Sequence, residues 1–228
     1  VMSTSSWSRI LQKPLHRIAL SSSNSLPPLI RAAGLSSRTN HFDRCTMTTT
    51  SATTTTSRTP SFKTTPDICD DIDDDNLQIV DPAVGIHCVG STHKSHFGGQ
   101  IVTVKCHEDN SLIKKLATSM DGTSKVMVVD GGGSRRRALL GDQVASSLVE
   151  SNWEGILIYG FIRDIDEIQQ LHELGVFALG THPRKTEKRN EGQVGIPVKF
   201  GGVTFHPGHW IVCDNNGIVV SEKDPRTV

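Results

Sequence analysis

Short runs of apolar, β-branched residues alternate with segments of helical periodicity in the middle of the chain. The runs favour strands and the segments between them favour helices, so the alternation predicts parallel β-α-β units. Positions 126–129 and 156–158 are continuously apolar, as expected of strands that are covered on both faces. The expected strands are residues 100–106, 125–130, 155–159 and 176–179, and the expected helices are residues 110–119, 142–152 and 166–174.

The pattern changes after Gly192, where short strands and tight turns follow one another. An Asp-Asn-Asn-Gly sequence at 214–217 separates apolar runs at 211–213 and 218–220, which predicts a β-hairpin. The expected fold is therefore α/β, with a central, partly parallel sheet, flanking helices and additional antiparallel strands.

An acidic cluster of six aspartates occupies residues 67–75. Within it, Ile68 and Ile72 are spaced as in a short amphipathic helix that ends before Leu77. The cluster lacks the spaced glycine and terminal glutamate of an EF-hand loop, so we expect a solvated, acidic helix start and no calcium site.

Charge divides the chain into two unlike parts, although the formal net charge is zero. Residues 1–63 hold eight basic residues and one acid, which leaves 16 basic and 23 acidic residues in the remainder. The basic part is rich in Ser and Thr, so we expect residues 1–66 to be a disordered extension and residues 67–228 to be the folded domain. This composition is typical of a transit peptide to a mitochondrion or plastid. The alternative is a cytoplasmic protein whose true start is Met47.

Several classes of protein are disfavoured by composition. No apolar run approaches the 18 residues of a membrane-spanning helix. Five widely spaced cysteines without a CxxC pair favour a reducing compartment and disfavour structural zinc. Two HxxH pairs (93/96 and 206/209) lack a zincin glutamate, and the arginines at 135–137 lack a nucleic-acid motif, so neither feature is expected to bind metal or nucleic acid.

Candidate chemistry begins where the strand at 125–130 ends. A Gly-Gly-Gly turn follows it, and Gly141 and Asp142 then open a helix, with Asp142 as the natural N-cap. The backbone amides of Gln143 and Val144 fall in the unpaired first turn, which suits an anion. The glycines match neither dinucleotide nor P-loop patterns, so a nucleotide site is not supported. The alternative is that Asp142 only caps the helix.

A second candidate is the pair Arg163 and Asp164, in the segment 158–164 where the strand expected at 155–159 ends. An ordinary surface ion pair is the alternative for these two residues. Because parallel strands present their carboxyl ends at one edge of a sheet, we expect them close to Gly141 and Asp142. A guanidinium, helix-start amides and a carboxylate could together hold a 2-keto acid beside a divalent metal ion.

Four segments resemble the RraA-like family, which holds 4-hydroxy-4-methyl-2-oxoglutarate aldolases and the proteins called regulator of ribonuclease E activity A. An Asp, twenty intervening residues and then Arg-Asp is the most diagnostic element, and Asp142, Arg163 and Asp164 match it. The fold is then expected to be of the β/β/α swivelling-domain type. The segments are FGGQIVTVKCHEDN (97–110), VMVVDGGGSRRRALLGD (126–142), EGILIYGFIRDIDEI (154–168) and FGGVTFHPG (200–208).

The resemblance implies a class II pyruvate aldolase that depends on Mg²⁺ or Mn²⁺ and forms a homotrimer or a dimer of trimers. It implies that Gly141, Asp142, Gln143 and Val144 hold the substrate, that Arg163 binds its pyruvyl group, and that Asp164 anchors the metal. Asp142 and Arg163 are the expected catalytic residues.

The mechanism expected from these roles needs no Schiff-base lysine. The substrate is expected to be 4-hydroxy-4-methyl-2-oxoglutarate or a related 4-hydroxy-2-keto acid, cleaved to pyruvate, with oxaloacetate decarboxylation as a second activity. A metal-bound water organised by Asp142 is the candidate general base. The competing function is a non-catalytic modulator of a ribonuclease E-type enzyme: the FGGQIVTVKC and FGGVTF strings look closer to that branch, whereas Asp164 fits the aldolases.

Overall fold

A computed structural model describes residues 63–89 and 94–227 of the chain. Most of the expected extension, Met47 and His93 lie outside the described residues. The first helix, α1 (Thr65–Asp71), begins two residues before the expected boundary at residue 67, and its N-cap Thr64 accepts a hydrogen bond from the backbone of Asp67. No helix within the described ranges is long and apolar enough to cross a membrane.

A ten-stranded mixed sheet forms the centre of the described chain. Its strand order is β1-β12-β11-β3-β4-β6-β7-β2, with β5 added beside β6 and β8 beside β3. The neighbours β3, β4, β6 and β7 run parallel, and β1, β2, β8, β11 and β12 pair antiparallel. The strands are β1 (Leu77–Ile79), β2 (His87–Cys88), β3 (Phe97–Lys105), β4 (Lys125–Asp130), β5 (Ala138–Leu140), β6 (Gly155–Ile162), β7 (Gly175–Thr181), β8 (Gln193–Val194), β11 (Trp210–Cys213) and β12 (Ile218–Ser221).

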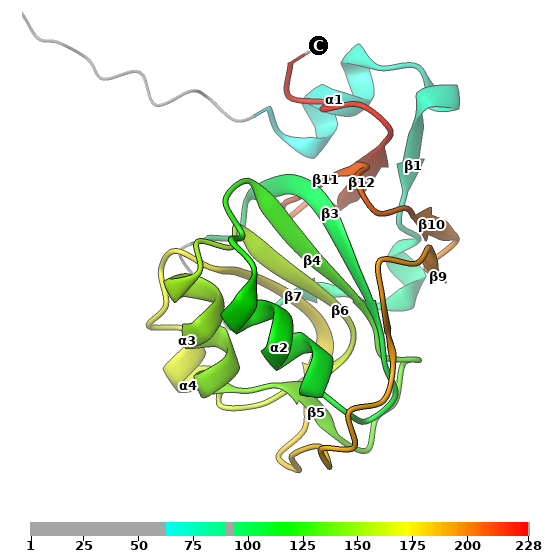
Figure 1. Cartoon of the computed structure of the whole chain (residues 1–228). Coiled ribbons are helices and arrows are strands. Elements are labelled where there is room, and N and C mark those ends of the chain that lie inside the picture. The colour runs from blue at the N-terminus through cyan, green and yellow to red at the C-terminus, as the bar shows by residue number, and fades with distance from the viewer. Residues whose placement is uncertain (1–62, 90–93, 228) are drawn as a thin grey trace, which may run out of the picture. The chain divides into compact units, whose positions relative to one another are not determined.

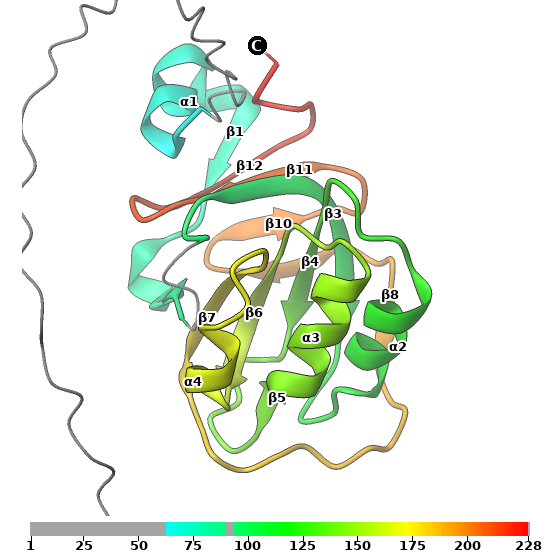
Figure 2. The same ribbon diagram turned by 90° about the vertical axis from the view of Figure 1, so that its left-hand side faces the viewer.

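Helices cover one face of this sheet and a small second sheet covers the other (Figures 1 and 2). The helical layer consists of α2 (Ser111–Ser119), α3 (Asp142–Glu150) and α4 (Ile165–Ile168). The second sheet is the hairpin of β9 (Val198–Phe200) and β10 (Val203–Phe205). Three layers result, as expected for the β/β/α type.

Successive side chains of β4 point to opposite faces of the sheet, so this one strand contributes to the hydrophobic cores on both faces. Met127 and Val129 pack with the helices, whereas Val126 and Val128 pack with β9 and β10. All four side chains are fully buried, because both faces of a parallel sheet are covered. The continuous apolar run at 126–129 was therefore correctly interpreted as a central strand.

The turn predicted at 214–217 joins β11 to β12 as an antiparallel hairpin, and the Asp214 amide donates to the Gly217 carbonyl at 3.0 Å. Asp214 also accepts hydrogen bonds from the backbone amide and the hydroxyl of Thr65, both at 2.7 Å. This buried carboxylate therefore ties α1 to the hairpin.

One helix prediction needs correction. The helix expected over 166–174 is the four-residue α4, after which the chain forms tight turns in which Leu171 bonds back to Ile168 and Leu174 to Leu171. These apolar residues recur every three positions, which suits turns of i→i+3 type better than an α-helix.

The acidic helix ends at Asp71, and a separate 3₁₀ turn at Asp74–Asn76 leads into β1. A second 3₁₀ turn, Pro82–Val84, precedes β2.

Candidate active site

The start of α3 exposes backbone N–H groups. Gly141 is its N-cap in an extended conformation, and the Gly141 carbonyl accepts the first helical hydrogen bond, from Ala145. The sequence predicted Asp142 as the N-cap, and this is wrong: Asp142 is the first helical residue, because β5 runs directly into Gly141 and sets where the helix begins. Among the described residues, nothing accepts from the amides of Gln143 and Val144, so both are available to an anion.

Arg163 and Asp164 follow β6 directly beside this helix start. The Arg163 amide donates to the Leu140 carbonyl at 3.0 Å, which fixes the end of β6 against the end of β5. Asp164 has φ +57°, in the left-handed region that a non-glycine residue seldom adopts. Its Oδ2 lies 3.2 Å from Nε of Arg163 and 3.4 Å from the backbone nitrogen of Asp142. The two segments that the sequence singled out therefore meet in space.

Gly141 is required at the contact between the two segments. A Cβ atom there would lie 2.7 Å from Oδ2 of Asp164 and 3.1 Å from Nε of Arg163. Its φ is −144°, an extended value open to any residue, so the requirement is steric. The absence of a side chain lets the carboxylate approach the α3 terminus.

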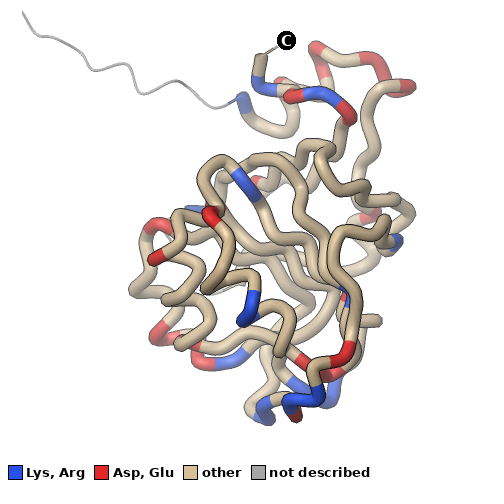
Figure 3. Tube along the Cα trace, viewed as in Figure 1, with Lys and Arg blue, Asp and Glu red and all other residues tan. Residues whose placement is uncertain are grey.

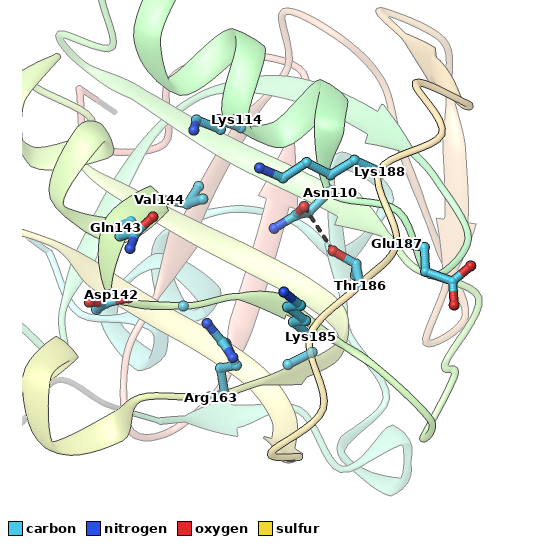
Figure 4. Close-up of a pocket in the computed structure, with 12 residues that line it drawn as sticks. Asn110, Lys114, Asp142, Gln143, Val144, Arg163, Lys185, Thr186, Glu187 and Lys188 are labelled. Atoms are coloured by element: carbon cyan, nitrogen blue, oxygen red, sulfur yellow. Dashed lines mark hydrogen bonds between the residues drawn. The ribbon is translucent and has the colours of Figure 1, made fainter.

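Gly141–Val144 and Arg163 line one cavity of about 560 Å³, shown in Figure 4, whereas the predicted metal ligand Asp164 contacts Arg163 and Asp142 but is not one of the lining residues. The cavity lies beyond the carboxyl end of β6, which is the usual place for ligands in an open α/β sheet. Four of its lining residues carry cationic side chains and two carry carboxylates. The lining residues are Asn110, Lys114, Ala138, Gly141, Asp142, Gln143, Val144, Arg163, Lys185, Thr186, Glu187 and Lys188.

Sequence reasoning missed the wall of the cavity opposite α3. Lys114 comes from α2, and Lys185 and Lys188 come from the segment after β7 (Figure 4). None of these three ammonium groups forms an ion pair with a carboxylate in the described ranges, whereas Glu187 is paired with Arg137 at 2.6 Å. The density of basic residues at 184–189, seen as blue positions in the segment after β7 (Figure 3), was a usable signal, although periodicity could not place this segment near α3.

The three-glycine turn after β4 has a structural role. The amides of Gly131 and Gly133 both donate to the carbonyl of Tyr159, at 3.1 and 3.2 Å. A Cβ at Gly133 would lie 3.0 Å from the Tyr159 ring. These glycines allow the turn to pack over β6, and none of them lines the cavity.

The remaining polar features lie apart from the cavity lining. Arg136 pairs with Glu108 at 2.7 Å, and hydrogen bonds from Ser134 and Arg136 lower the pKa of Glu108. The imidazoles of His206 and His209 lie 4.9 Å apart, centroid to centroid, in the turn before β11. Within the described ranges, no group of three or more His, Cys, Asp or Glu could hold a metal ion.

A divalent cation at this site would therefore rest on few protein ligands. Oδ1 of Asp164 accepts no hydrogen bond from the described residues, and the side chain is 29% exposed. A single accessible carboxylate oxygen fits Mg²⁺, which keeps several waters and takes one or two carboxylates. It does not fit a closed structural site of zinc type.

The fold and cavity define the class of protein: an α/β domain with a cavity at a strand end that is lined by four cationic side chains. The family model described as RraA-like, Aldolase/RraA, matches residues 65–220, and the chain belongs to this family.

Three relatives illustrate the range of the family. The chain is 53% identical over 159 residues to a protein of Stutzerimonas stutzeri (strain A1501) named "Putative 4-hydroxy-4-methyl-2-oxoglutarate aldolase", covering 70% of this chain and 94% of that protein. The RNA-processing inhibitor RraA from Thermus thermophilis has a TM-score of 0.67 at 31% identity, covering 73% and 96%. A structure described as S-adenosylmethionine: 2-dimethylmenaquinone methyltransferase from Geobacillus kaustophilus HTA426 has a TM-score of 0.66 at 39% identity, covering 71% and 96%.

Proposed function

We propose that this protein is a divalent-metal-dependent lyase that cleaves 4-hydroxy-4-methyl-2-oxoglutarate, or a related 4-hydroxy-2-keto acid, to pyruvate. One observation carries the proposal. Arg163 and the residues that carry the unpaired first-turn amides of α3 line one cavity, and the carboxylate of Asp164 contacts the edge of this group, 3.2 Å from Nε of Arg163 and 3.4 Å from the backbone nitrogen of Asp142. The name of the relative from Stutzerimonas stutzeri agrees with this chemistry.

The residues of the chain can hold the pyruvyl half of such a substrate. The amides of Gln143 and Val144 point out of a helix N-terminus, where a carboxylate is favoured by both hydrogen bonding and the helix dipole. Arg163 offers a planar, permanently charged fork to the 2-keto oxygen, and it can stabilise the negative charge that develops there as the C–C bond breaks.

Asp164 is the residue that would anchor the metal, with waters completing the ligand set. When bound, a divalent cation would supply Lewis-acid stabilisation of the oxygen that becomes negatively charged. Asp142 lines the cavity, and its backbone amide lies next to the Asp164 carboxylate. No described residue donates a hydrogen bond to the carboxylate of Asp142 itself. We propose that its carboxylate accepts the proton of the 4-hydroxyl group, directly or through one water.

Three lysines that line the cavity, Lys114, Lys185 and Lys188, indicate which keto acids the site favours, and we call them the lysine wall. Lys185 and Lys188 lie across the cavity from the start of α3, and Lys114 lines the cavity from α2 (Figure 4). Unpaired ammonium groups on the far wall suit a second carboxylate, on the half of the substrate that leaves as a keto acid. None of the described residues that line the cavity is aromatic, which disfavours a nucleoside such as that of S-adenosylmethionine.

The direct test is pyruvate release by the purified protein from several 4-hydroxy-2-keto acids, with Mg²⁺ or Mn²⁺ and with EDTA. We expect turnover that disappears on chelation and returns with excess metal. Oxaloacetate should be decarboxylated as a second activity, because it would pass through the same enolate. Turnover that is unaffected by EDTA would refute the metal requirement.

A non-catalytic modulator of ribonuclease E-type activity is the second candidate, favoured by the similarity to the Thermus RraA structure. Absence of lyase activity together with tight binding to such a ribonuclease would support it. The homotrimer, or dimer of trimers, and a targeting role for residues 1–66 stay predictions. Light scattering and localisation of the full-length chain test them.

A further inference from the structure

The segment after β7 forms one wall of the cavity, and we call residues 184–191 the strap. It carries Lys185 and Lys188, which line the cavity, and it has no regular secondary structure apart from an isolated bridge at Lys185. A segment of this kind does not hold two long side chains in place by its own backbone hydrogen bonds. Its position must be set by the rest of the molecule.

The strap is fastened along its length by its neighbours. At its start, the Arg184 carbonyl accepts from the Ala138 amide at 2.8 Å. The Lys185 carbonyl accepts from Nη1 of Arg137 at 3.0 Å. In the middle, the Thr186 hydroxyl donates to Oδ1 of Asn110 at 2.8 Å.

Asp109 fastens the end of the strap from a fully buried position. Its Oδ2 accepts the backbone amides of Arg189 and Glu191, at 2.8 and 3.0 Å. Its Oδ1 accepts the amide and the hydroxyl of Ser111, at 2.8 and 2.6 Å. A single carboxylate thus joins the first turn of α2, which also provides Lys114, to the strap that provides Lys185 and Lys188.

Asp109 remains charged in this position. Although burial raises its pKa, the hydrogen bonds from Ser111, Glu191 and Arg189 outweigh burial and lower the pKa to about 2. Four donors converge on the side chain, and a neutral amide could not accept all four, since its NH₂ group would face backbone N–H groups.

We propose that Asp109 is a positioning residue for the lysine wall: by holding the strap against α2, it sets the place at which the distal carboxylate of the substrate binds. This inference rests on the lyase function proposed above and deepens it. The distal carboxylate does not react, so its contacts contribute equally to the bound substrate and to the transition state. Loss of those contacts should raise KM and leave kcat nearly unchanged.

The chain provides a matched control in Asp121. Its Oδ1 accepts the amide and the hydroxyl of Thr123, at 3.1 and 2.8 Å, which repeats the local pattern of Asp109 and Ser111. Asp121 is exposed, does not line the cavity and does not contact the strap. Both Asp109→Asn and Asp121→Asn therefore remove a carboxylate that accepts two hydrogen bonds from the residue two positions further on. Only Asp109→Asn also removes the hydrogen bonds that hold the strap.

The experiment compares both variants with the wild type by steady-state kinetics and by limited trypsin digestion. For a 4-hydroxy-2-keto dicarboxylate, we expect Asp109→Asn to raise KM about tenfold, the equivalent of ~1.4 kcal/mol of binding. For a 4-hydroxy-2-keto monocarboxylate, KM should not change. Trypsin should cut faster at the four basic residues 184, 185, 188 and 189 in Asp109→Asn only.

Different outcomes separate the two proposals. An active wild type with unchanged strap cleavage and unchanged KM in Asp109→Asn overturns the positioning role alone. Equal rises in KM for both substrates overturn it as well, because they indicate general damage. An inactive wild type overturns the lyase proposal and the positioning role with it. If Asp109→Asn does not fold, Arg137→Ala removes the hydrogen bond that fastens the Lys185 carbonyl at the start of the same strap; Arg137 does not line the cavity, and the variant is judged by the same two measurements.

Discussion

The backbone nitrogen of Asp142 lies 3.4 Å from Oδ2 of Asp164, although the two residues are 22 positions apart in the chain. One residue begins a helix and the other follows a strand, and the contact places a carboxylate directly against a helix N-terminus. The left-handed backbone of Asp164 (φ +57°) accompanies this placement. Backbone outliers of this kind are costly and often occur at functional sites, which makes Asp164 the first residue to test.

Replacement of Asp164 by Ala should remove metal-dependent turnover. The variant loses the accessible carboxylate that would anchor the cation, and the loss of several kcal/mol of transition-state stabilisation corresponds to ~10³-fold in kcat/KM. Pyruvate release at saturating Mg²⁺ measures this. Asp166→Ala is the control, because Asp166 is exposed and its carboxylate contacts neither Arg163 nor the start of α3, unlike that of Asp164. Full metal-dependent turnover by Asp164→Ala would contradict the assignment.

Replacement of Gly141 by Ala should disturb the same contact without removing any functional group. Its methyl group would lie 2.7 Å from Oδ2 of Asp164, so the Asp164 carboxylate must shift away from the start of α3. Because small misplacements of a catalytic group cost ~10² in rate, we expect a loss of about that size in kcat. The matched control is Gly217→Ala, where a Cβ meets nothing within 4 Å. Normal kinetics in Gly141→Ala would show that the Asp142–Asp164 approach is unimportant.

Replacement of Lys188 by Ala should weaken binding of the distal carboxylate. Lys188 lines the cavity and forms no ion pair with a described carboxylate, so its removal leaves none of these carboxylates without a counter-charge. A partly exposed charge pair contributes up to ~1 kcal/mol, so KM for a keto dicarboxylate should rise up to about fivefold while kcat stays the same. Lys199→Ala, on the exposed side of β9, is the control. Identical KM values in the two variants would exclude Lys188 from the substrate site.

Local patterns predicted the parts of the site that follow strands. The apolar run at 126–129 and the junction at Ile162–Arg163 mark strand ends, and the rule that ligands bind beyond strand carboxyl ends then brought Gly141 and Arg163 together. Asp142 was misplaced by one position as the N-cap, because the preceding β5 strand, only three residues long, left no clear pattern.

The position of the lysine wall next to α3 could not be predicted from the sequence, because long-range hydrogen bonds set that position. Asp109 contacts the strap across 80 and 82 residues of sequence, and Asn110 reaches Thr186 across 76. No periodicity within the strap itself indicates that it passes α2. A buried carboxylate that organises a distant loop appears in the sequence only as an ordinary aspartate before a helix.

The charge of Asp109 should make a pH-dependent contribution to folding. Its pKa is lowered from an ordinary 3.8 to about 2 in the folded protein, so the charged form is favoured by folding. The stabilisation is therefore fully present above about pH 4 and is lost as the pH falls towards 2, with a size of about 2 kcal/mol.

Urea denaturation of the wild type and Asp109→Asn between pH 7 and pH 2 tests this contribution. At pH 7 the variant should have the lower free energy of unfolding, and the difference should shrink below about pH 4, where the wild-type carboxyl group becomes protonated as well. The Asp121→Asn control should differ far less from the wild type, because the Asp121 carboxylate is exposed and its partners can bond to water instead. A difference for Asp109→Asn that stays constant down to pH 2 would mean that packing, and not the charge of Asp109, holds the strap to α2.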